Sequence, residues 1–400
     1  MIKGEIYNRI NLFVGGLILF SLMLFPDISL SAGLPKFKFI DFLLPVIGVL
    51  LFLQRARIRW EHIYKFVLIY VVYIAFVIIY NGRQDIMRDY FELYKLIKFL
   101  GVILFFTLID YKQFFKFWIK PTFVIVIIGN LIHYFEFFGL NSILEEHYNG
   151  GIHIQLFGLN SLGEPDMKRM VGFAGNPNIN ALVFAFFTVL FLPKLSRTNS
   201  QYYWFFGAVF MFFLCQSRTN FVALIVVLMF MFHWNRNQTK FNLKVVGLVA
   251  IAFILSFLVS SNSYINLLFD KKIVQNNSLL GRFEVWKLLW EMIKEKPLFG
   301  HGPFKEYFYE RELYVENEYI LQTWRYGFVG LFVFLGILLS PFQSAWKNKS
   351  LFFSFEFIAF SLFILLNSLM NTPFTNPTIN LLFAITIGLY YSDLRNKKAV

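Results

Sequence analysis

The chain has 400 residues, of which 58% are hydrophobic, 20% are aromatic and only 15% are charged. A soluble domain carries about 25% charged residues, and a soluble protein could not cover this much apolar surface. The composition therefore excludes soluble enzymes, disordered scaffolds and nucleic-acid-binding domains, although the net charge is +13. The class that remains is a polytopic helical membrane protein.

Apolar stretches recur along the whole chain with lengths close to that of a membrane-spanning helix, which needs about 20 apolar residues. The first follows a basic N-terminus without a small-residue cleavage site, so we expect it to be retained as a span. Two short stretches, 202–217 and 219–234, are joined by almost no loop and could instead form a re-entrant pair. We predict an all-α fold with about twelve spans, at 10–26, 38–54, 62–80, 93–109, 117–137, 178–194, 202–217, 219–234, 243–260, 318–339, 352–370 and 377–392.

Basic residues predict the orientation of these spans, because cytoplasmic loops carry an excess of lysine and arginine. With the N-terminus inside, the cytoplasmic segments hold 19 of the 37 basic residues and four acids, namely Glu5, Glu61, Asp110 and Asp393. Both termini are therefore predicted to be cytoplasmic, and the positive charge is topological. The basic residues counted are Lys3, Arg9, Arg55, Arg57, Arg59, Lys65, Lys112, Lys116, Lys120, Lys194, Arg197, Arg236, Lys240, Lys244, Lys347, Lys349, Arg395, Lys397 and Lys398.

Two long segments, about 138–177 and 261–317, fall on the outer side of the membrane. The cytoplasmic loops are short and no GxxxxGK[ST] sequence occurs, so we expect no nucleotide-driven reaction. Residues 1–400 are predicted to form a single integral membrane domain, with the active site in the two outer segments. The single cysteine, Cys215, excludes an intrachain disulfide and a cysteine-based metal cluster.

The first outer segment ends in a pattern of arginine, glycine and asparagine. Arg169 is followed by Gly172 and by Asn176-Pro177-Asn178, which forms a turn ahead of a span, where Asn178 could cap the helix. Between the two short spans lies Ser217-Arg218, at the predicted outer membrane face. An arginine between two spans is costly unless it binds something, so Arg218 is a candidate ligand-binding residue.

The second outer segment carries the densest pattern. Residues 282–295 are amphipathic and predict an interfacial helix, which Pro297 ends. Gly300-His301-Gly302-Pro303 predicts a tight turn, since glycine allows positive φ. Glu316-Asn317 directly precedes a span, a position that can face a cavity at the membrane surface. Gly327 and Gly330 then have a spacing that lets neighbouring helices approach closely.

The order and spacing of these motifs resemble the O-antigen ligase and polymerase superfamily of bacterial inner-membrane proteins. The family pattern has an Arg, a Trp, PLxGxGP, and an Asn separated by nine residues from G-x-x-G. Here these are Arg282, Trp286, the segment from Pro297 to Pro303, Asn317, and Gly327 with Gly330. The earlier R-x-x-G-x-x-x-NPN-x-x-A pattern matches from Arg169 to Ala181, and Ser217-Arg218 is a third match, so that motifs cover about a fifth of the chain.

The resemblance implies transfer of a glycan from undecaprenyl diphosphate to a hydroxyl acceptor on the outer face of the cytoplasmic membrane. The diphosphate leaving group supplies the driving force and gathers negative charge in the transition state. Arginine is always charged and binds phosphate through paired N–H donors. Arg169, Arg218 and Arg282 are therefore the expected diphosphate clamp, and neither a metal nor a cofactor is expected.

The acceptor hydroxyl needs a base within hydrogen-bond reach. Glu316 is the first candidate and His301 the second, while Asn317 is expected to orient the base or the sugar. Direct displacement at the anomeric carbon would invert its configuration. Ligases of the family have histidine where Glu316 stands, so this chain resembles a polymerase of lipid-linked repeat units more than a ligase.

Other functions stay open on the sequence alone. A ligase would move finished glycan to lipid A core or another acceptor, and a flippase would transport lipid-linked oligosaccharide. A flippase predicts internal repeats and charges deep in the spans, but the sequence shows no repeat and few such charges. The expected partners are the undecaprenyl-diphosphate-linked oligosaccharide as donor and acceptor, membrane lipid, and a chain-length regulator and flippase of the same pathway. Nucleic acid is not an expected partner.

Each site residue also has a plainer interpretation. The arginines could contact lipid phosphates or end a helix, Glu316 could simply pair with a base, and the turn around His301 could be structural. Glu164 and Asp166 resemble the acidic motif of metal-dependent membrane glycosyltransferases, but two acids in a loop are common. Asp41 lies within a predicted span, where a charge is expensive, and the sequence names no partner for it.

Overall fold

The fold is all-α, as predicted. The computed structural model describes residues 2–26, 28, 37–82, 87–135, 137–140, 169–193, 200–234, 239–259, 277–311 and 313–399. Helix accounts for 81% of the structure, and in these ranges the only extended pairing is a single bridge between Ile28 and Phe37. Residues 141–168 of the first predicted outer segment, including Glu164 and Asp166, lie outside the described residues, as do 261–276 and 312 of the second.

The main helices follow one another along the whole chain. Their bounds are α1 (Ile2–Leu24), α2 (Phe39–Leu53), α3 (His62–Tyr80), α4 (Met87–Phe106), α5 (Tyr111–Phe114), α6 (Lys120–Phe135), α8 (Pro177–Leu190), α9 (Ser200–Leu214), α10 (Arg218–Trp234), α11 (Thr239–Val259), α13 (Asn277–Glu295), α14 (Lys305–Glu310), α15 (Glu318–Lys347), α16 (Ser354–Asn367) and α17 (Pro377–Ala399). The short turns η1 (Arg55–Arg57), η2 (Phe115–Ile119), η3 (Phe137–Gly139) and η5 (Gly172–Ala174) complete the described elements.

Every predicted apolar stretch falls on a helix or on consecutive helices of this series. Four helical segments of the described chain are long and apolar enough to cross a membrane: Glu5–Leu24, His62–Tyr80, Tyr111–Phe135 and Glu318–Lys347. Other apolar helices, such as α8 and α16, have 14 residues each. Apolar helices of membrane-protein type are thus shown, whereas the number of twelve spans stays a prediction.

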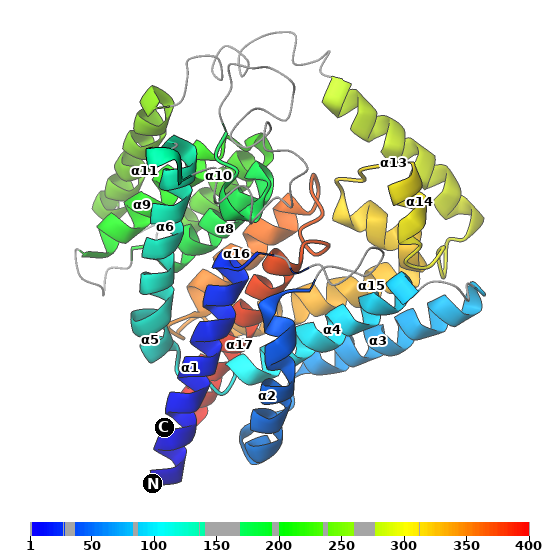
Figure 1. The fold of residues 1–400 in the computed structure, drawn as a ribbon, viewed down its shortest axis with the longest axis horizontal. Helices are drawn as coiled ribbons and strands as arrows, with labels where there is room; N and C mark the ends of the chain where they lie inside the picture. Colours follow the sequence, from blue (N-terminus) through cyan, green and yellow to red (C-terminus); the bar gives the residue numbers. More distant parts are fainter. Residues whose placement is uncertain are drawn as a thin grey trace.

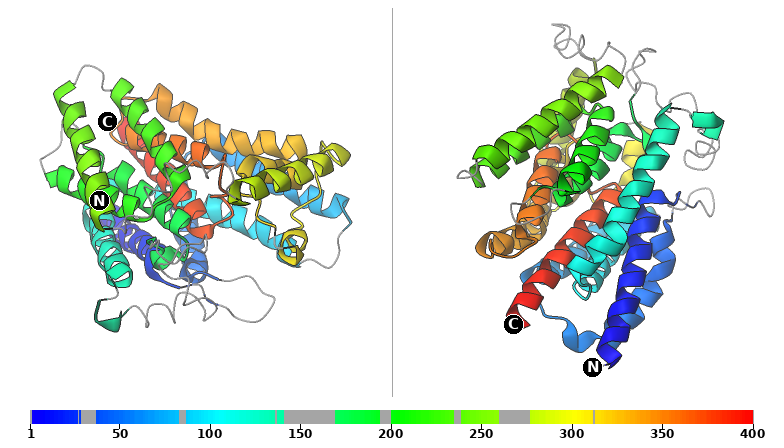
Figure 2. Two further views of the ribbon diagram at one scale, coloured as in Figure 1. Left: turned by 90° about the horizontal axis from the view of Figure 1, so that it is seen from above. Right: turned by 90° about the vertical axis from the view of Figure 1, so that its left-hand side faces the viewer.

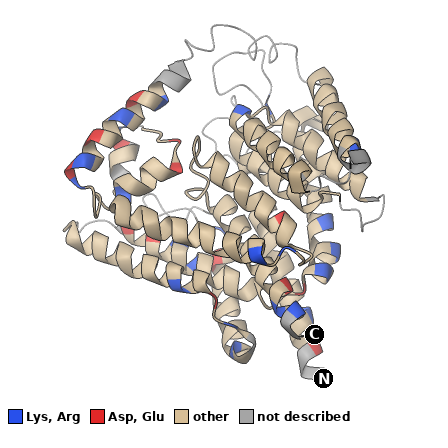
Figure 3. Cartoon of the chain, turned by 180° about the vertical axis from the view of Figure 1, so that it is seen from behind, with Lys and Arg blue, Asp and Glu red and all other residues tan. Residues whose placement is uncertain are grey.

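The arrangement of the helices separates two regions. Figures 1 and 2 show α1, α6 and α17 running alongside one another, with both chain termini at the same end. At the opposite end, α13 and α14 lie over α15, on the far side of the molecule from α9 and α11. One large apolar core joins most helices, and a second, smaller cluster around Trp324 joins α13 to α15. Figure 3 shows Lys and Arg near the termini, and mixed charge on α13.

Helix α15 is broken in its N-terminal third, at Gly327. Gly327 has φ +64° and ψ −175°, which is not helical. A Cβ atom at this glycine would lie 2.1 Å from the carbonyl oxygen of Leu298, so no other residue fits. The prediction that Gly327 lies close to a neighbouring helix is therefore wrong, because Gly327 instead packs against the loop at Leu298. Gly330 does approach a helix, because its Cβ position lies 3.1 Å from Tyr73 of α3.

The turn from Gly300 to Pro303 forms hydrogen bonds with the backbone of α15 at this break. The backbone N–H of His301 donates to the carbonyl oxygen of Trp324 at 3.0 Å, and Gly302 donates to Arg325 at 2.7 Å. In return, Phe328 N–H donates to the Pro297 carbonyl oxygen at 2.8 Å. Backbone groups freed inside a membrane protein must find internal partners. The motif from Pro297 to Pro303 supplies them, and so ties the loop before α15 to this apolar helix.

Replacing Gly327 with alanine is expected to prevent correct folding. An unfavourable backbone conformation alone costs about 1–3 kcal/mol, and the added Cβ would collide with the loop at Leu298. The yield of monodisperse protein after detergent extraction should fall sharply. Gly101→Ala is the matched control, since the space around Gly101 is open. Equal yields from both variants would contradict the assigned role of the break.

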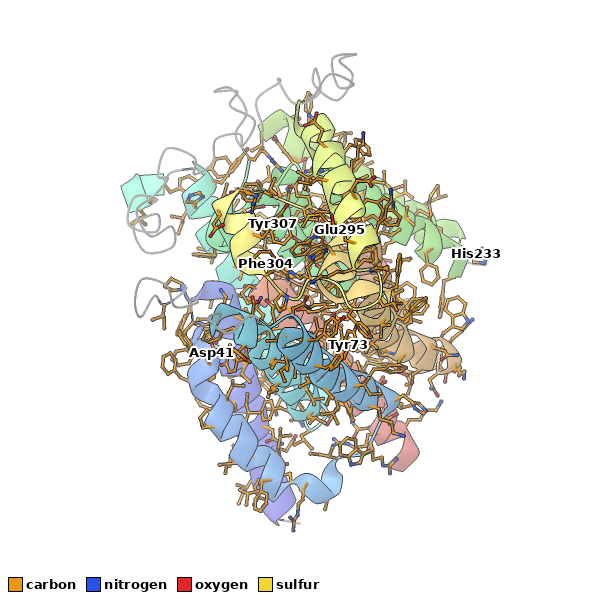
Figure 4. The ribbon with its side chains drawn as sticks, turned by 90° about the vertical axis from the view of Figure 1, so that its right-hand side faces the viewer. Asp41, Tyr73, His233, Glu295, Phe304 and Tyr307 are labelled. Atoms are coloured by element: carbon orange, nitrogen blue, oxygen red, sulfur yellow. The ribbon has the colours of Figure 1, made fainter. Side chains whose placement is uncertain are left out.

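The structure supplies the partner that Asp41 needs. Lys98 of α4 lies 2.6 Å from the Asp41 carboxylate, and both side chains are buried. Tyr94 donates to the same oxygen at 2.7 Å, and the backbone N–H of Lys38 donates to the other at 2.7 Å. Figure 4 labels Asp41 on α2, facing α4. This buried ion pair joins α2 to α4.

Breaking this pair from one side should destabilise the protein. Removing one partner of a buried ion pair costs about 3–5 kcal/mol, whereas removing both charges is often close to neutral. Lys98→Met should therefore lower the midpoint of thermal unfolding in detergent, and Asp41→Asn combined with Lys98→Met should recover most of the loss. If the double variant unfolds at the lower midpoint too, the pair is not the cause.

Candidate functional site

The first two arginine motifs meet at one cluster. Arg169, which is buried, donates from Nη2 to Oδ1 of Asn178 at 3.0 Å and from Nε to the Cys215 carbonyl oxygen at 3.3 Å. Ser217 Oγ donates to the same oxygen of Asn178 at 2.8 Å. We name Arg169, Asn178, Ser217 and Asn220 the asparagine cluster. It brings two motifs that lie some 40 residues apart in the sequence to the start of α10.

The capping of α8 differs in one residue from the prediction. Asn176, not Asn178, is the N-cap, because its Oδ1 accepts from the backbone N–H of Asn178 at 2.8 Å and of Ile179 at 3.3 Å. The side chain of Asn178 is thereby free to bind Arg169 and Ser217. Gly172 has φ +55°, and a Cβ there would lie 1.7 Å from Oδ1 of Asn130. The glycine and the first asparagine of the motif therefore shape the backbone around the cluster.

A second helix begins in the same way as α8. Residues 376–380 read NPTIN, close to NPNIN at 176–180. Oδ1 of Asn376 accepts from the N–H of Thr378 at 3.0 Å and of Ile379 at 3.2 Å. The starts of α8 and α17 border a common cavity of about 90 Å³. This short sequence similarity was not recognised in the prediction that the chain has no repeat.

The third motif places Arg282 against Glu316. Arg282 Nε of α13 forms an ion pair with Oε2 of Glu316, and the two side chains are 17% and 33% exposed. Trp286, one turn further along α13, donates from Nε1 to the Val315 carbonyl oxygen at 2.6 Å. Glu316 itself has φ +42°, a strained conformation for this residue type. Neighbouring contacts therefore hold this carboxylate in a defined place beside an arginine.

Glu316 borders a cavity of about 220 Å³, as its position before a span predicts. Helix α4 also lines it through Glu92 and Lys95, which pair at 3.1 Å. We name this space the Glu316 cavity. The other polar side chains that line it are Arg325, Thr372 and Thr375.

Asn317 and His301 have structural contacts. Asn317 caps α15, since its Oδ1 accepts from the Ile320 N–H at 3.0 Å, and its Nδ2 donates to the Leu369 carbonyl oxygen at 2.9 Å. Nε2 of His301 lies 2.9 Å from the Met292 carbonyl oxygen, and its ring stacks on Trp324 at 5.1 Å. The Glu316 cavity is not lined by His301.

The aromatic residues after the turn complete the environment of Trp324. Phe304 stacks on Trp324 at 6.0 Å with an interplanar angle of 9°, and Tyr307 lies 5.4 Å away (Figure 4). His301 thus belongs to the smaller apolar core beneath α13 and α14. This contact set agrees with the plainer interpretation of the glycine turn as a structural element.

The segment between α16 and α17 connects the asparagine cluster to the start of α15. Nδ2 of Asn367 donates to Oδ1 of Asn220 at 2.5 Å. The next carbonyl oxygen, of Ser368, accepts from the Glu318 N–H at 2.9 Å. Of the predicted clamp, Arg169 therefore lies in the asparagine cluster, Arg218 directly follows Ser217 of that cluster in sequence, and Arg282 pairs with Glu316.

Sequence reasoning missed two charged residues in α15. Glu318 is fully buried, and its carboxylate accepts from Gln322 Nε2 at 2.7 Å and from the Phe374 N–H at 3.1 Å. Arg325 is only 7% exposed and lines the Glu316 cavity. A signal was present, because Glu318 and Arg325 are charges seven residues apart in a predicted span, and so share one helix face.

Comparison with known proteins covers the second half of this site. Residues 203–335 match the protein-family model described as O-Antigen ligase. The match includes Ser217-Arg218, Arg282, Glu316 and Arg325. No curated protein matches the chain. Members of this family are glycosyltransferase-like enzymes. This match confirms the resemblance for the motifs that lie within residues 203–335, and it is consistent with the O-antigen ligase and polymerase superfamily.

Proposed function

We propose that the protein is a polymerase that joins undecaprenyl-diphosphate-linked oligosaccharide units on the outer face of the bacterial cytoplasmic membrane. The observation that carries this proposal is the ion pair of Glu316 with Arg282, two residues within the family match, of which Glu316 lines a cavity. In this pair, the Glu316 carboxylate that would deprotonate the acceptor lies beside the Arg282 guanidinium that would bind the leaving diphosphate. Glutamate in place of the histidine of ligases favours repeat units as acceptor.

In the proposed reaction, an acceptor hydroxyl oxygen forms a bond to the anomeric carbon of the donor. The bond from that carbon to the diphosphate oxygen breaks, and the hydroxyl proton passes to Glu316. Diphosphate leaves with the bonding electron pair, and Arg282 stabilises its charge. Substrate binding would exchange one partner of Arg282 for another, because the diphosphate replaces Glu316 on the guanidinium. The carboxylate is then free to accept the proton.

The asparagine cluster takes a supporting part in this proposal. Arg218, the half-buried first residue of α10, follows Ser217 directly and would contact the diphosphate together with Arg282. Arg169 already donates to Asn178 and to the Cys215 carbonyl oxygen, so it holds the start of α10 in place and adds its positive charge. Because arginine charge stabilises the leaving diphosphate, the proposed reaction is metal-independent. Because the acceptor displaces the diphosphate directly, the reaction inverts the anomeric centre.

A ligase is the second candidate, because the matched family is described as O-Antigen ligase. Deletion of the protein followed by gel analysis of surface glycan separates the two functions. Loss of a polymerase leaves acceptor that bears one repeat unit. Loss of a ligase leaves bare acceptor and polymer still attached to the carrier lipid. In both cases we propose that the reaction takes place on the outer face of the membrane and that both chain termini lie in the cytoplasm. A polymerase would also work with a flippase and a chain-length regulator of the same pathway.

A further inference from the structure

The Glu316 cavity extends beyond the reacting pair. Besides Glu316, the cavity is lined by Arg325, Lys95 and two threonines, Thr372 and Thr375. Neither Arg325 nor the threonines have a part in the proposed reaction. Their presence calls for a ligand group that would lie within reach of the proposed base.

Arg325 is the strongest sign of such a ligand. Its side chain is 7% exposed, and in the described part of the protein its buried Nε has no hydrogen-bond partner. Buried polar groups are normally paired, so an unpaired buried N–H in a cavity wall needs an explanation. The backbone around it is fixed, because its carbonyl oxygen accepts from Gly302 at 2.7 Å. The base of this side chain is therefore held in place in the cavity lining.

The charges around the cavity favour a neutral polyhydroxyl group over an anion. Two acids, Glu92 and Glu316, balance two bases, Lys95 and Arg325, among the residues that line it. A phosphate at Arg325 would meet both carboxylates. A sugar ring instead offers hydroxyl groups that both donate and accept, and so can satisfy carboxylate, guanidinium and threonine together. Apolar surface for the ring comes from Phe308 and Tyr314.

We infer that the Glu316 cavity binds the sugar residue whose hydroxyl attacks the donor, with Arg325 as the residue that determines acceptor binding. The inference rests on the proposed function and gives it an acceptor subsite. The sugar lies between Arg325 and Glu316, which brings one hydroxyl to the base. Donor binding, at Arg282 and the asparagine cluster, is separate.

The test uses the full-length protein in lipid nanodiscs. The probe is the free repeat-unit oligosaccharide, released by mild acid from the lipid-linked material of cells that lack the protein. Arg325→Met should raise the KM for this acceptor about tenfold, the effect of losing one hydrogen bond to a charged group. The KM for the lipid-linked donor should stay within about twofold. Arg311→Met, which removes an exposed arginine after α14, is the matched control.

A second variant guards against misfolding of Arg325→Met. Thr372→Tyr fills the cavity from a half-exposed position without removing a buried charge, and should raise the acceptor KM as well. An unchanged acceptor KM in both variants, or a rise in the donor KM instead, would overturn the inference. The second result would place the donor phosphates in the cavity.

Binding is measured separately from transfer by saturation-transfer NMR of the same oligosaccharide. The wild-type protein should saturate the protons of its terminal sugar, and Arg325→Met should not. If the wild-type protein binds the sugar in this way but transfers nothing, the proposed reaction fails and the subsite stands. If the signal persists in Arg325→Met, the subsite assignment fails whatever the activity.

Discussion

Glu316→Gln is expected to reduce polymer synthesis by about 10²–10⁴-fold, the usual contribution of a positioned general base. Glutamine keeps the size of the side chain and can still contact Arg282, but it cannot take the acceptor proton. The protein should therefore fold and insert normally while surface glycan stops at one repeat unit. The measurement is the initial rate of transfer in nanodiscs, together with the glycan ladder on a gel.

Glu284→Gln is the control for this experiment, since Glu284 is an exposed carboxylate on α13 outside the cavity. It should leave the rate unchanged. A fully active Glu316→Gln protein would mean that another residue is the base. His301→Gln would then become the next variant, although the contacts of His301 with Met292 and Trp324 favour a structural part for it.

Arg282→Ala should lower the rate of transfer and should also remove the ion pair that holds Glu316 in place. A hydrogen bond to a charged group contributes about 1.5–3 kcal/mol, which corresponds to roughly a 10- to 150-fold lower rate for each contact with the diphosphate. Loss of the guanidinium also leaves Glu316 without its ion-pair partner. Cells that carry this variant should show little or no long-chain glycan.

Two further variants isolate the cause. Arg282→Lys keeps the charge but loses the paired donors, so an intermediate rate is expected. Lys287→Ala removes an exposed cation from the same helix and should have no effect. Normal long-chain glycan in Arg282→Ala cells would refute the assignment of Arg282 to the diphosphate.

The sequence predicted the parts of this protein that depend on local patterns. Apolar stretches located the helices, and α3 begins and ends at the predicted residues 62 and 80. Motif order placed Arg282 and Glu316 in one site although 34 positions separate them, because a family resemblance carries tertiary information that spacing alone lacks. The turn before Pro303 was also predicted from its glycines.

What the sequence did not predict depends on contacts between distant segments. Lys98 lies 57 positions from Asp41, and no local pattern links them. Arg325 was hidden because an apolar stretch is judged by its average, in which one charge counts little. The two glycines of the last motif have a spacing typical of helix contacts, whereas Gly327 breaks the helix. A positive φ at that glycine is a property of its surroundings, not of its neighbours in sequence.

The break in α15 has a consequence for how this site can change during evolution. The chain between α13 and α15 is hydrogen-bonded to α15 at two places. Gly302 N–H donates to the Arg325 carbonyl oxygen, and the Asn317 side chain caps the helix. Between these two attachments the chain leaves α15 and returns to it, so that both ends of the loop are held in place. Glu310 and Arg311 are exposed within this loop and can therefore change without disturbing its ends. Such a design would let relatives of this protein accept different glycans by changing exposed loop residues while the membrane helices stay the same.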